Sequence, residues 1–485
     1  MRRVIVILII SLFMITLISP AVSAQASSQT KTPIKHVIAV LFENHTFDNF
    51  FGIYPYDNAS WNESIIRNMT VPENLIGTGH LSQLRAVPNG VYSTPDPVEG
   101  YTAYHLDWNH GKMNNFINGS GPQSMEYYTS YQLGLEWSIA SEYAIADRYF
   151  APQLSESAPN TLYYIAGFSP VINDYGPPPS FPMSETIFGE LSHYGISWNI
   201  YVQNNTTGNF DNMQHYISNW NQYSGHLLSW SDLISEAQNN SLPAVSYVFS
   251  EGPPGFSQAP PSNVEKGEIW LAYLINQIEE SPSWNSTAIF VTYDDPGGFY
   301  DQVDPPMMDG VQLGMRLPMI LVSPFAKEDY VSNTVMTHTS IIAFIDYNWG
   351  IPALNKFVSL SNIPLDMFDF SMPYKNGYVA RPPIDLQSEQ HLPPNLHFSI
   401  DPKVIDYNFS GAFPFAPQYS YSVLPYSREG ASNVTLSSLH YGIFIEHDIS
   451  YTPFYYSPAY FIIIAVVGAV LFWIGGEVYE RNRRH

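Results

Sequence analysis

The sequence predicts an α/β fold in which a mostly parallel central sheet carries helices on both faces. Three short apolar runs, at residues 36–42, 288–293 and 319–323, are rich in β-branched residues, as expected for strands covered on both faces. Residues 264–280 instead place apolar residues on one helical stripe and stop before Ser281-Pro282. Strand-like and helical segments thus alternate, which is the order typical of a parallel sheet with crossover helices.

The 485 residues are enough for one large domain with additional segments. We place the main domain at residues 33–370. From residue 371 to residue 452 the helical pattern disappears, and Pro, Tyr and Ser are frequent. We expect this part to be a β-rich or irregular stalk next to a membrane.

Both ends of the chain carry membrane signals. Arg2 and Arg3 precede an apolar run and then small residues, so residues 1–24 are typical of a secretory signal peptide. Residues 455–476 form an apolar segment long enough to cross a bilayer, and the basic tail 477–485 follows it. The positive-inside rule places this tail in the cytoplasm and the rest outside, which predicts a single-pass cell-surface protein. A buried core helix is the alternative for the apolar segment.

Sites of the form Asn-x-Ser/Thr favour the same exterior location, and we expect them to carry N-linked glycans. The alternative is that they only reflect polar loops rich in Asn. Besides Asn44, which we expect to be unglycosylated, the sites are Asn58, Asn62, Asn68, Asn118, Asn204, Asn205, Asn239, Asn285, Asn408 and Asn433.

Composition excludes several classes of function. Lys and Arg number 19 against 43 Asp and Glu, a net charge of −24, so nucleic acid is not an expected partner. The chain has no cysteine, which excludes disulfides, thiolate nucleophiles and iron–sulfur sites. Hydroxyl, imidazole and carboxylate chemistry remains.

Polar pairs directly follow two of the predicted strands. The first strand runs into Glu43-Asn44, and the strand at residues 288–293 runs into Asp294-Asp295. Side chains at the carboxyl ends of parallel strands can converge, and oxygen ligands of this kind suit a hard divalent cation or Zn²⁺. Each pair alone is more typical of a loop acid or a helix cap. The Gly-Gly pair that follows the second one permits a tight turn, so the two interpretations remain open.

Five ordered segments resemble the bacterial and archaeal phosphoesterase family, which contains phospholipases C and related acid phosphatases. The similarity extends over about residues 33–370, and five motifs in order are far more specific than one. It implies an alkaline-phosphatase-like α/β fold and hydrolysis of phosphate mono- or diesters. The segments are IKHVIAVLFENHTFDNFFGIYP (34–55), WNHGKMNNF (108–116), SAPNTLYYIAG (157–167), VTYDDPGGFYDQVDPP (291–306), and GMRLPMILVSPFAK with THTSIIAFID (314–327 and 337–346).

The resemblance implies that Ser157 is the nucleophile, because it matches the hydroxyl residue of the family's Thr/Ser-x-Pro-Asn segment. Pro159 lies in the first turn of a helix predicted to run through Ala166, which places Ser157 near the N-cap. Free N–H groups there favour an anionic oxygen. From the local sequence alone, a simple capping role is the stronger alternative.

The resemblance also implies one divalent metal ion of unknown identity, held by Glu43, Asn44, Asp294 and Asp295 and completed by the Ser157 hydroxyl. Such a cation would lower the pKa of the hydroxyl and neutralise charge on the attacked phosphoryl group.

Three histidines are candidates to donate to phosphate oxygens or to protonate the leaving group. His105 and His110 flank Trp108 in the second similar segment, and His338 precedes a predicted helix in the fifth. For each of them, a structural hydrogen-bonding role is the alternative.

Three positions depart from the family pattern. Ala259 follows Gln258 where many members have Asp-His, Thr161 replaces the usual Arg after Pro-Asn, and Pro296 replaces a common His. These losses reduce the positive charge around a phosphate. Three interpretations remain open: an altered substrate preference, a larger role for the metal, or a degenerate enzyme. The nucleophile and metal residues are present in type, which favours activity.

We therefore expect a membrane-anchored extracellular acid phosphatase that works through a phosphoserine intermediate. One alternative is a phospholipase C that cleaves phosphodiesters, and a second is a catalytically degenerate, glycosylated surface protein. Few charges and many uncharged polar groups suit acidic surroundings, so we expect an acid pH optimum.

Overall fold

The computed structural model describes residues 30–52, 84–129, 131–174, 179–203, 213–250, 256–371, 374–375 and 378–379. They all belong to one compact unit, Met1–Asn433. The predicted signal peptide (1–24), membrane segment (455–476) and tail (477–485) lie outside the described residues. So does the predicted stalk, apart from Ser371 and the short strands β15 (Tyr374–Lys375) and β16 (Tyr378–Val379).

No helix in these described ranges is long and apolar enough to span a membrane. The membrane segment stays a prediction.

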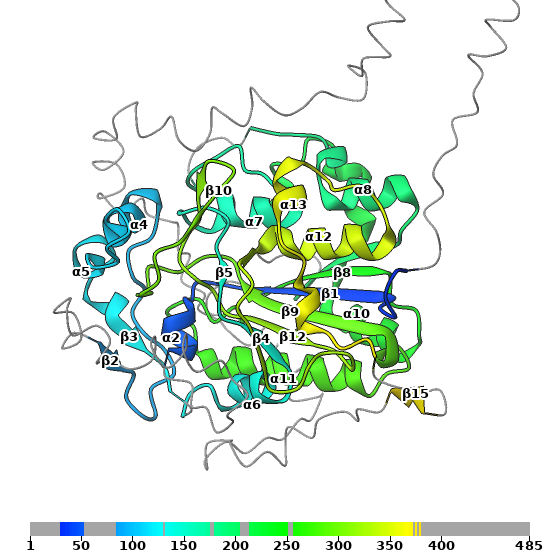
Figure 1. The fold of residues 1–485 in the computed structure, drawn as a ribbon, viewed down its shortest axis with the longest axis horizontal. Helices are drawn as coiled ribbons and strands as arrows, with labels where there is room; N and C mark the ends of the chain where they lie inside the picture. Colours follow the sequence, from blue (N-terminus) through cyan, green and yellow to red (C-terminus); the bar gives the residue numbers. More distant parts are fainter. Residues whose placement is uncertain are drawn as a thin grey trace, which may run out of the picture. The chain divides into compact units, whose positions relative to one another are not determined.

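An eight-stranded sheet with the order β13-β4-β12-β9-β1-β8-β6-β7 forms the centre of this unit (Figure 1). β1 pairs in parallel with β8 and β9, whereas β12 is antiparallel to both β9 and β4. The predicted mostly parallel sheet is therefore confirmed, and the three predicted strands are β1, β9 and β12. The strands are β1 (His36–Phe42), β4 (Ala144–Ala146), β6 (Trp198–Val202), β7 (Leu227–Ser229), β8 (Val245–Phe249), β9 (Thr287–Tyr293), β12 (Met319–Val322) and β13 (Tyr330–Ser332).

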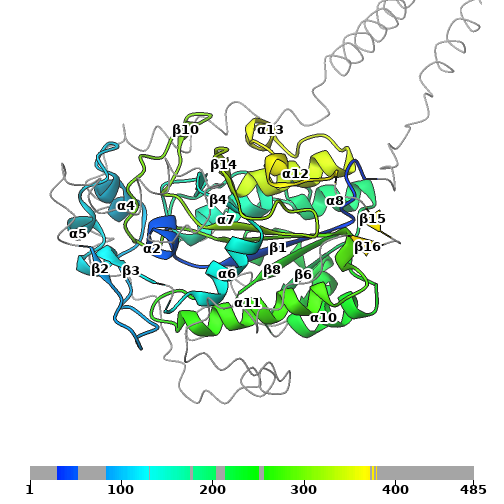
Figure 2. The ribbon, with the colours of Figure 1, turned by 60° about the horizontal axis from the view of Figure 1, so that its bottom comes forward.

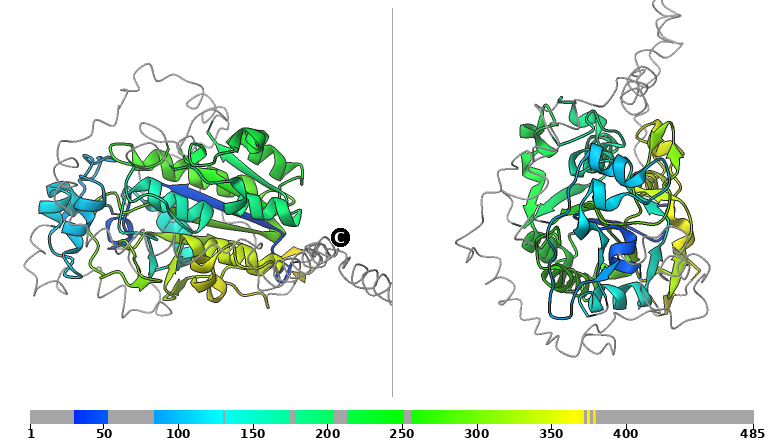
Figure 3. Two further views of the ribbon diagram at one scale, coloured as in Figure 1. Left: turned by 90° about the horizontal axis from the view of Figure 1, so that it is seen from above. Right: turned by 90° about the vertical axis from the view of Figure 1, so that its left-hand side faces the viewer.

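Helices cover both faces of the sheet, as expected (Figures 1 and 2). One layer contains α7 (Ser157–Ala166), α8 (Ile187–Tyr194), α12 (His338–Trp349) and α13 (Lys356–Leu360). The other contains α6 (Gly134–Glu142), α10 (Trp230–Gln238) and α11 (Val264–Glu279). The left-hand view of Figure 3 shows β1 running between the two layers. α11 matches the helix predicted from the apolar stripe to within one residue.

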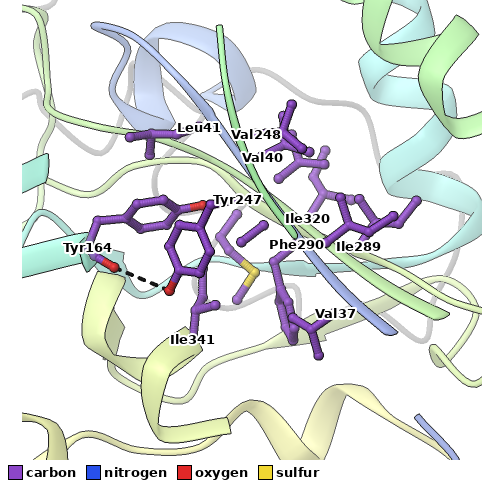
Figure 4. Close-up of a cluster of buried hydrophobic side chains, with 14 of the residues drawn as sticks. Val37, Val40, Leu41, Tyr164, Tyr247, Val248, Ile289, Phe290, Ile320 and Ile341 are labelled. Carbon is purple, nitrogen blue, oxygen red and sulfur yellow. Dashed lines mark hydrogen bonds between the residues drawn. The ribbon is translucent and has the colours of Figure 1, made fainter. Parts of the chain in front are cut away.

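The core lies between the sheet and these layers. Val37, Val40 and Leu41 of β1 are fully buried, and Figure 4 shows them beside neighbouring strands and α7. The Tyr247 hydroxyl donates to the Tyr164 carbonyl at 3.4 Å, which satisfies a polar group inside this apolar cluster. β1 is buried on both faces, and this explains why its sequence is an unbroken apolar run.

The shorter elements lie mainly around the ends of the strands. They are α2 (Phe47–Phe51), α4 (Tyr101–Trp108), α5 (Phe116–Gly119), β2 (Arg85–Ala86), β3 (Glu126–Tyr127), β5 (Tyr149–Phe150), β10 (Met307–Met308), β11 (Val311–Gln312) and β14 (Met336–Thr337). Six single-turn 3₁₀ helices complete the described chain: Pro122–Met125, Met183–Glu185, Trp220–Gln222, Ser224–His226, Trp284–Ser286 and Pro364–Met367.

Two carboxyl groups, Glu190 of α8 and Asp346 of α12, interact within one of the helix layers. Burial, and then the charge of Asp346, raises the pKa of Glu190 from 4.5 to about 9. Burial likewise raises the pKa of Asp346 to about 7. The pair therefore keeps a proton over a pH range in which the unfolded chain would release it.

This pair predicts that the fold is more stable in acid. Because the folded pKa of Glu190 lies above 4.5, its contribution is complete below that pH and is lost as the pH rises toward 9. We expect the Tm to fall between roughly pH 5 and pH 8, and Glu190→Gln to reduce that fall, in thermal unfolding followed by circular dichroism. Glu280→Gln, at an exposed position after α11, is the matched control. An unchanged pH dependence in Glu190→Gln would contradict the assignment.

Candidate active site

The predicted polar pairs meet at the carboxyl ends of β1 and β9. Phe42 and Tyr293, the last residues of these strands, are paired neighbours in the sheet. The backbone N–H of Asn44 donates to Asp294 Oδ1 at 3.1 Å, so the two pairs are in direct contact. The right-hand view of Figure 3 faces the side on which α2 and α4 lie. The convergence expected from the ends of parallel strands is present.

A tight turn brings these residues together. Asn44 has φ of 68°, and a Cβ atom on Gly297 would lie 2.3 Å from the Asn44 carbonyl oxygen. Gly297 itself has φ of 58° and donates its N–H to Asp295 Oδ1 at 2.6 Å. Only glycine satisfies both the conformation and the close approach.

Ser157 lies beside the second pair. Its Oγ donates to Asp295 Oδ2 at 3.0 Å, and the hydroxyl of Tyr104 donates to Asp295 Oδ1 at 3.2 Å. Ser157 is the first residue of α7, and the side chain of its N-cap residue, Glu156, makes no capping hydrogen bond. Ser157 is therefore next to the N-cap, as expected. The alternative capping role is absent, because the Ser157 hydroxyl contacts Asp295 instead.

Asn160 holds the segment that precedes the serine. Its Nδ2 donates to the carbonyls of Ser155 and Glu156 at 2.7 and 3.0 Å, and its Oδ1 accepts from the N–H of Gln153 at 2.8 Å. The side chain is fully buried. The asparagine of the Ser-x-Pro-Asn segment thus fixes the approach of the chain to Ser157, a role that sequence reasoning missed.

Four further acids surround the site, and the sequence provided no local signal for any of them. Glu99 Oε1 accepts from Asn44 Nδ2 at 2.6 Å. Asp174 Oδ1 accepts from the N–H of Ala158 at 2.7 Å, in the first turn of α7. Glu156 and Asp96 complete the set, since Glu156 accepts from the Asp174 N–H and Asp96 lies beside Glu99.

The carboxylates of this cluster lack positive partners. Burial raises the pKa of Asp294 to about 7. Burial, followed by neighbouring negative charge, raises the pKa values of Glu43, Glu99 and Asp295 well above their ordinary range. The ion pairs of the described residues form elsewhere, so no described Lys or Arg compensates these acids. A divalent cation would favour their charged forms.

The donor types fit such a cation. Asn44 Oδ1 is buried and accepts no hydrogen bond from any described residue. Because a carboxylate oxygen of Glu99 binds the amide nitrogen, the amide oxygen must face away from Glu99. The described His, Asp and Glu side chains contain no group of three arranged to bind a metal. Hydrogen bonds place Asn44, Ser157, Asp294 and Asp295 together, and Glu43 lies near enough for the charge of Asp294 to raise its pKa. The action of these five residues as ligands stays a prediction.

His338 contacts the backbone of the site. Its Nε2 donates to the carbonyl of Asp294 at 2.8 Å, and its Nδ1 accepts from the Tyr149 hydroxyl at 2.9 Å, since the carbonyl can only accept. Burial lowers the pKa of His338 to about 3, so the ring is neutral. Both nitrogens are used inside the protein, an arrangement that positions Asp294.

His105 and His110 lie on and just after α4. His105 Nδ1 donates to the carbonyl of Tyr101 at 2.8 Å, and burial lowers its pKa to about 4. His110 is exposed, with its ring 5.6 Å from that of Trp108. In the described part of the chain neither histidine is hydrogen-bonded to a predicted metal ligand. Tyr104 is the residue of this helix that reaches Asp295.

Gln258, which precedes Ala259 where many family members have a histidine, is part of a buried network. Its Nε2 donates to Glu136 Oε1, and its Oε1 accepts from the Tyr293 hydroxyl, both at 2.5 Å. Its carbonyl accepts from His45 Nε2 at 2.9 Å. This network holds His45 and Tyr293, which are the sequence neighbours of Asn44 and Asp294. His45 was not among the predicted site residues.

A family model described as the Phosphoesterase family matches residues 34–352, well over half of the chain. The chain belongs to the Phosphoesterase family. Phospholipase C B of Mycobacterium tuberculosis is 25% identical over 403 residues, which cover 67% of this chain and 75% of that protein. Non-hemolytic phospholipase C of Burkholderia pseudomallei is also 25% identical, over 67% of this chain and 56% of that protein. This Phosphoesterase family member is accordingly a phosphoric ester hydrolase.

Among solved structures, a protein in the alkaline phosphatase superfamily from Vibrio parahaemolyticus is similar to this family member with a TM-score of 0.33. The two are 13% identical, and the match covers 59% of this chain and 72% of the other.

Proposed function

We propose that this protein is a phospholipase C-type phosphodiesterase with Ser157 as its nucleophile. The observation that carries the proposal is the hydrogen bond from Ser157 Oγ to Asp295, at the start of α7 and beside Asn44 and Asp294. The start of α7 presents the positive end of the helix dipole to a phosphoryl oxygen, whereas the Ala158 N–H of this turn already donates to Asp174 and Pro159 has no N–H. Relatives named phospholipase C support this substrate class.

Glu43, Asn44, Asp294 and Asp295, together with the Ser157 hydroxyl, would hold one divalent cation. When bound, such a cation supplies electrostatic stabilisation of the phosphoryl group and lowers the pKa of a coordinated hydroxyl. The hydrogen bond from Asn44 Nδ2 to Glu99 supports this assignment, because the buried Asn44 Oδ1 accepts no hydrogen bond from a described residue.

The reaction divides into two displacements. Ser157 Oγ forms a bond to phosphorus and its proton passes to Asp295 Oδ2. The bond from phosphorus to the lipid alcohol breaks, and the departing alcohol oxygen takes this proton from Asp295. Water then attacks the phosphorus of the Ser157 adduct, which still carries the headgroup. One proton of this water passes through Asp295 to Ser157 Oγ as the phosphorylated headgroup leaves. In-line displacement of this kind depends mainly on positioning and electrostatics.

Charge favours a diester over a monoester. The cluster of buried acids has no described Lys or Arg partner, so an anionic substrate meets repulsion. A phosphodiester carries one negative charge, whereas a monoester carries nearly two above its second pKa of about 6. The singly charged substrate is therefore the easier one to admit.

An acid phosphatase is the second candidate. A phosphate monoester becomes singly charged below a pKa of about 6, which removes the disadvantage described above. The acid-stabilised Glu190–Asp346 pair is consistent with work in acidic surroundings and with an acid pH optimum.

We also propose a cell-surface location with N-linked glycans. The support is the predicted signal peptide at residues 1–24, the apolar segment at 455–476 and the Asn-x-Ser/Thr sites.

The substrate class is tested with the full chain in detergent, supplied separately with Mg²⁺, Mn²⁺ and Zn²⁺. We expect release of diacylglycerol from phosphatidylcholine, and a ratio of diester to monoester turnover that rises from pH 5 to pH 7.5 as the monoester gains charge. p-Nitrophenyl phosphate is the monoester probe. Turnover of the monoester alone would favour the acid phosphatase. No turnover of either substrate with any cation would favour the non-catalytic surface protein.

A further inference from the structure

Arg316 lies fully buried in an ion-pair cluster outside the site described above. Its guanidinium reaches Asp301 through Nε–Oδ1 and NH2–Oδ2 contacts of 3.0 Å each, and it reaches Asp48 Oδ1 at 2.8 Å. NH1 also donates to the carbonyl of Asp147 at 3.2 Å, and the guanidinium lies over the ring of Phe47 at 4.8 Å. One side chain therefore joins groups from three separate segments.

Two of these segments lead directly from the candidate site. Asp48, in α2, lies four residues after Asn44, and Asp301 lies six residues after Asp295. The segments also bond to each other, because Thr46 Oγ1 donates to the Tyr300 carbonyl at 2.7 Å and the Gln302 N–H donates to Asp48 Oδ2 at 2.9 Å.

The backbone of Arg316 takes part as well. Its carbonyl accepts from the N–H of Phe47, the first residue of α2, at 2.8 Å. The side chain and the main chain of one residue thus hold the same turn from two directions. A rigid link of this kind restricts how far the Asn44 and Asp295 segments can separate.

Arginine is the residue that suits this position. Two carboxylates and a carbonyl are arranged around a planar fork, and a lysine ammonium, as a point charge on a flexible stem, cannot contact all three in this geometry. Loss of the guanidinium would leave two buried Asp carboxylates without their partner.

We propose that Arg316 is a positioning residue for the catalytic site. It fixes the segment that carries Glu43 and Asn44 against the segment that carries Asp294 and Asp295. The side-chain oxygens of the two segments then stay close enough to bind one cation. This inference rests on the proposed function, because its consequence is expressed in cation binding.

The test compares the wild-type chain with Arg316→Lys and Asp48→Asn, each freed of metal. Isothermal titration with Mn²⁺ should show about 10–100-fold weaker binding in both variants, the range found when residues that orient metal ligands are changed. Hydrogen exchange should become faster in peptides that cover residues 43–52 and 294–303, also without Mn²⁺. Leu274→Ala, a buried α11 substitution away from both segments, controls for lowered stability alone.

Each outcome is informative. If Leu274→Ala lowers the Tm as much as Arg316→Lys yet binds Mn²⁺ like wild type, positioning is supported over general stabilisation. Wild-type affinity and exchange in a folded Arg316→Lys would overturn the inference while leaving the proposed function intact. If Arg316→Lys does not fold, Asp48→Asn decides in the same way, because it keeps the Asp301 pair. If the wild-type chain binds no Mn²⁺, Mg²⁺ or Zn²⁺, the metal assignment and this inference both fail.

Discussion

Ser157→Ala is expected to reduce phosphoester turnover by about 10⁴-fold or more, while the chain stays folded. The substitution removes the protein atom that forms the bond to phosphorus in the proposed reaction. It removes one hydrogen bond, to Asp295, and no helix cap, because the Ser157 hydroxyl contacts Asp295 and does not cap α7. The Tm should therefore change little. Turnover is measured as diacylglycerol release at saturating phosphatidylcholine.

Ser169→Ala is the matched control for this prediction. Its hydroxyl donates to the Val171 carbonyl just after α7 and contacts no residue of the candidate site. It should keep nearly full activity. A peptide that carries phosphocholine on Ser157, trapped by rapid acid quench in wild type and absent in Ser157→Ala, would support the covalent step directly. Turnover within tenfold of wild type in Ser157→Ala would exclude this nucleophile.

Asp295→Asn is expected to reduce turnover by about 10³-fold, in the range found for loss of a general base. The amide has the same shape, and its oxygen can still accept from Gly297 N and the Tyr104 hydroxyl. It cannot take the proton of Ser157, and it removes one negative charge from the cation position. Both effects act on the transition state rather than on the fold.

Asp295→Asn should lower turnover without lowering the stability of the metal-free protein. The Tm with and without Mn²⁺ then shows whether the variant has also lost cation binding. In metal-free protein, Asp295→Asn relieves the repulsion between adjacent buried carboxyls, so its Tm should equal or exceed that of wild type. Adding Mn²⁺ should raise the Tm of wild type and raise that of the variant much less, because a cation stabilises only the state that binds it. Asp309→Asn, at a surface ion pair, is the control. Equal Mn²⁺ shifts in the two proteins would remove Asp295 from the ligand set.

Local patterns were sufficient for the strands and helices around the site. The apolar run at residues 36–42 is β1, the run at 288–293 is β9 with one added residue, and the stripe at 264–280 is α11. Burial on both faces, or on one helical face, leaves a signature within the segment itself. The antiparallel direction of β12 leaves no such signature in its sequence, because an antiparallel strand in the centre of a sheet is buried in the same way as a parallel one.

The convergence of Asn44 and Asp294 could also be predicted, because parallel neighbouring strands end at the same edge of a sheet. That rule specifies which strand ends meet, but not which loops fold over them. Glu99 and Asp174 arrive from segments whose own sequence contains no motif for the site, and only the packed chain brings them to Asn44 and to α7.

The sequence alone was enough to assign the α/β class, the polar residues at the strand ends and the resemblance to the Phosphoesterase family, since each follows from local periodicity or from short motifs. The tertiary structure decided what each polar group contacts. It directed the Ser157 hydroxyl to Asp295 instead of a helix cap, and His338 to the backbone of Asp294. Hydrogen bonds depend on distances and directions between segments far apart in the chain, and these are defined only once the whole core has packed.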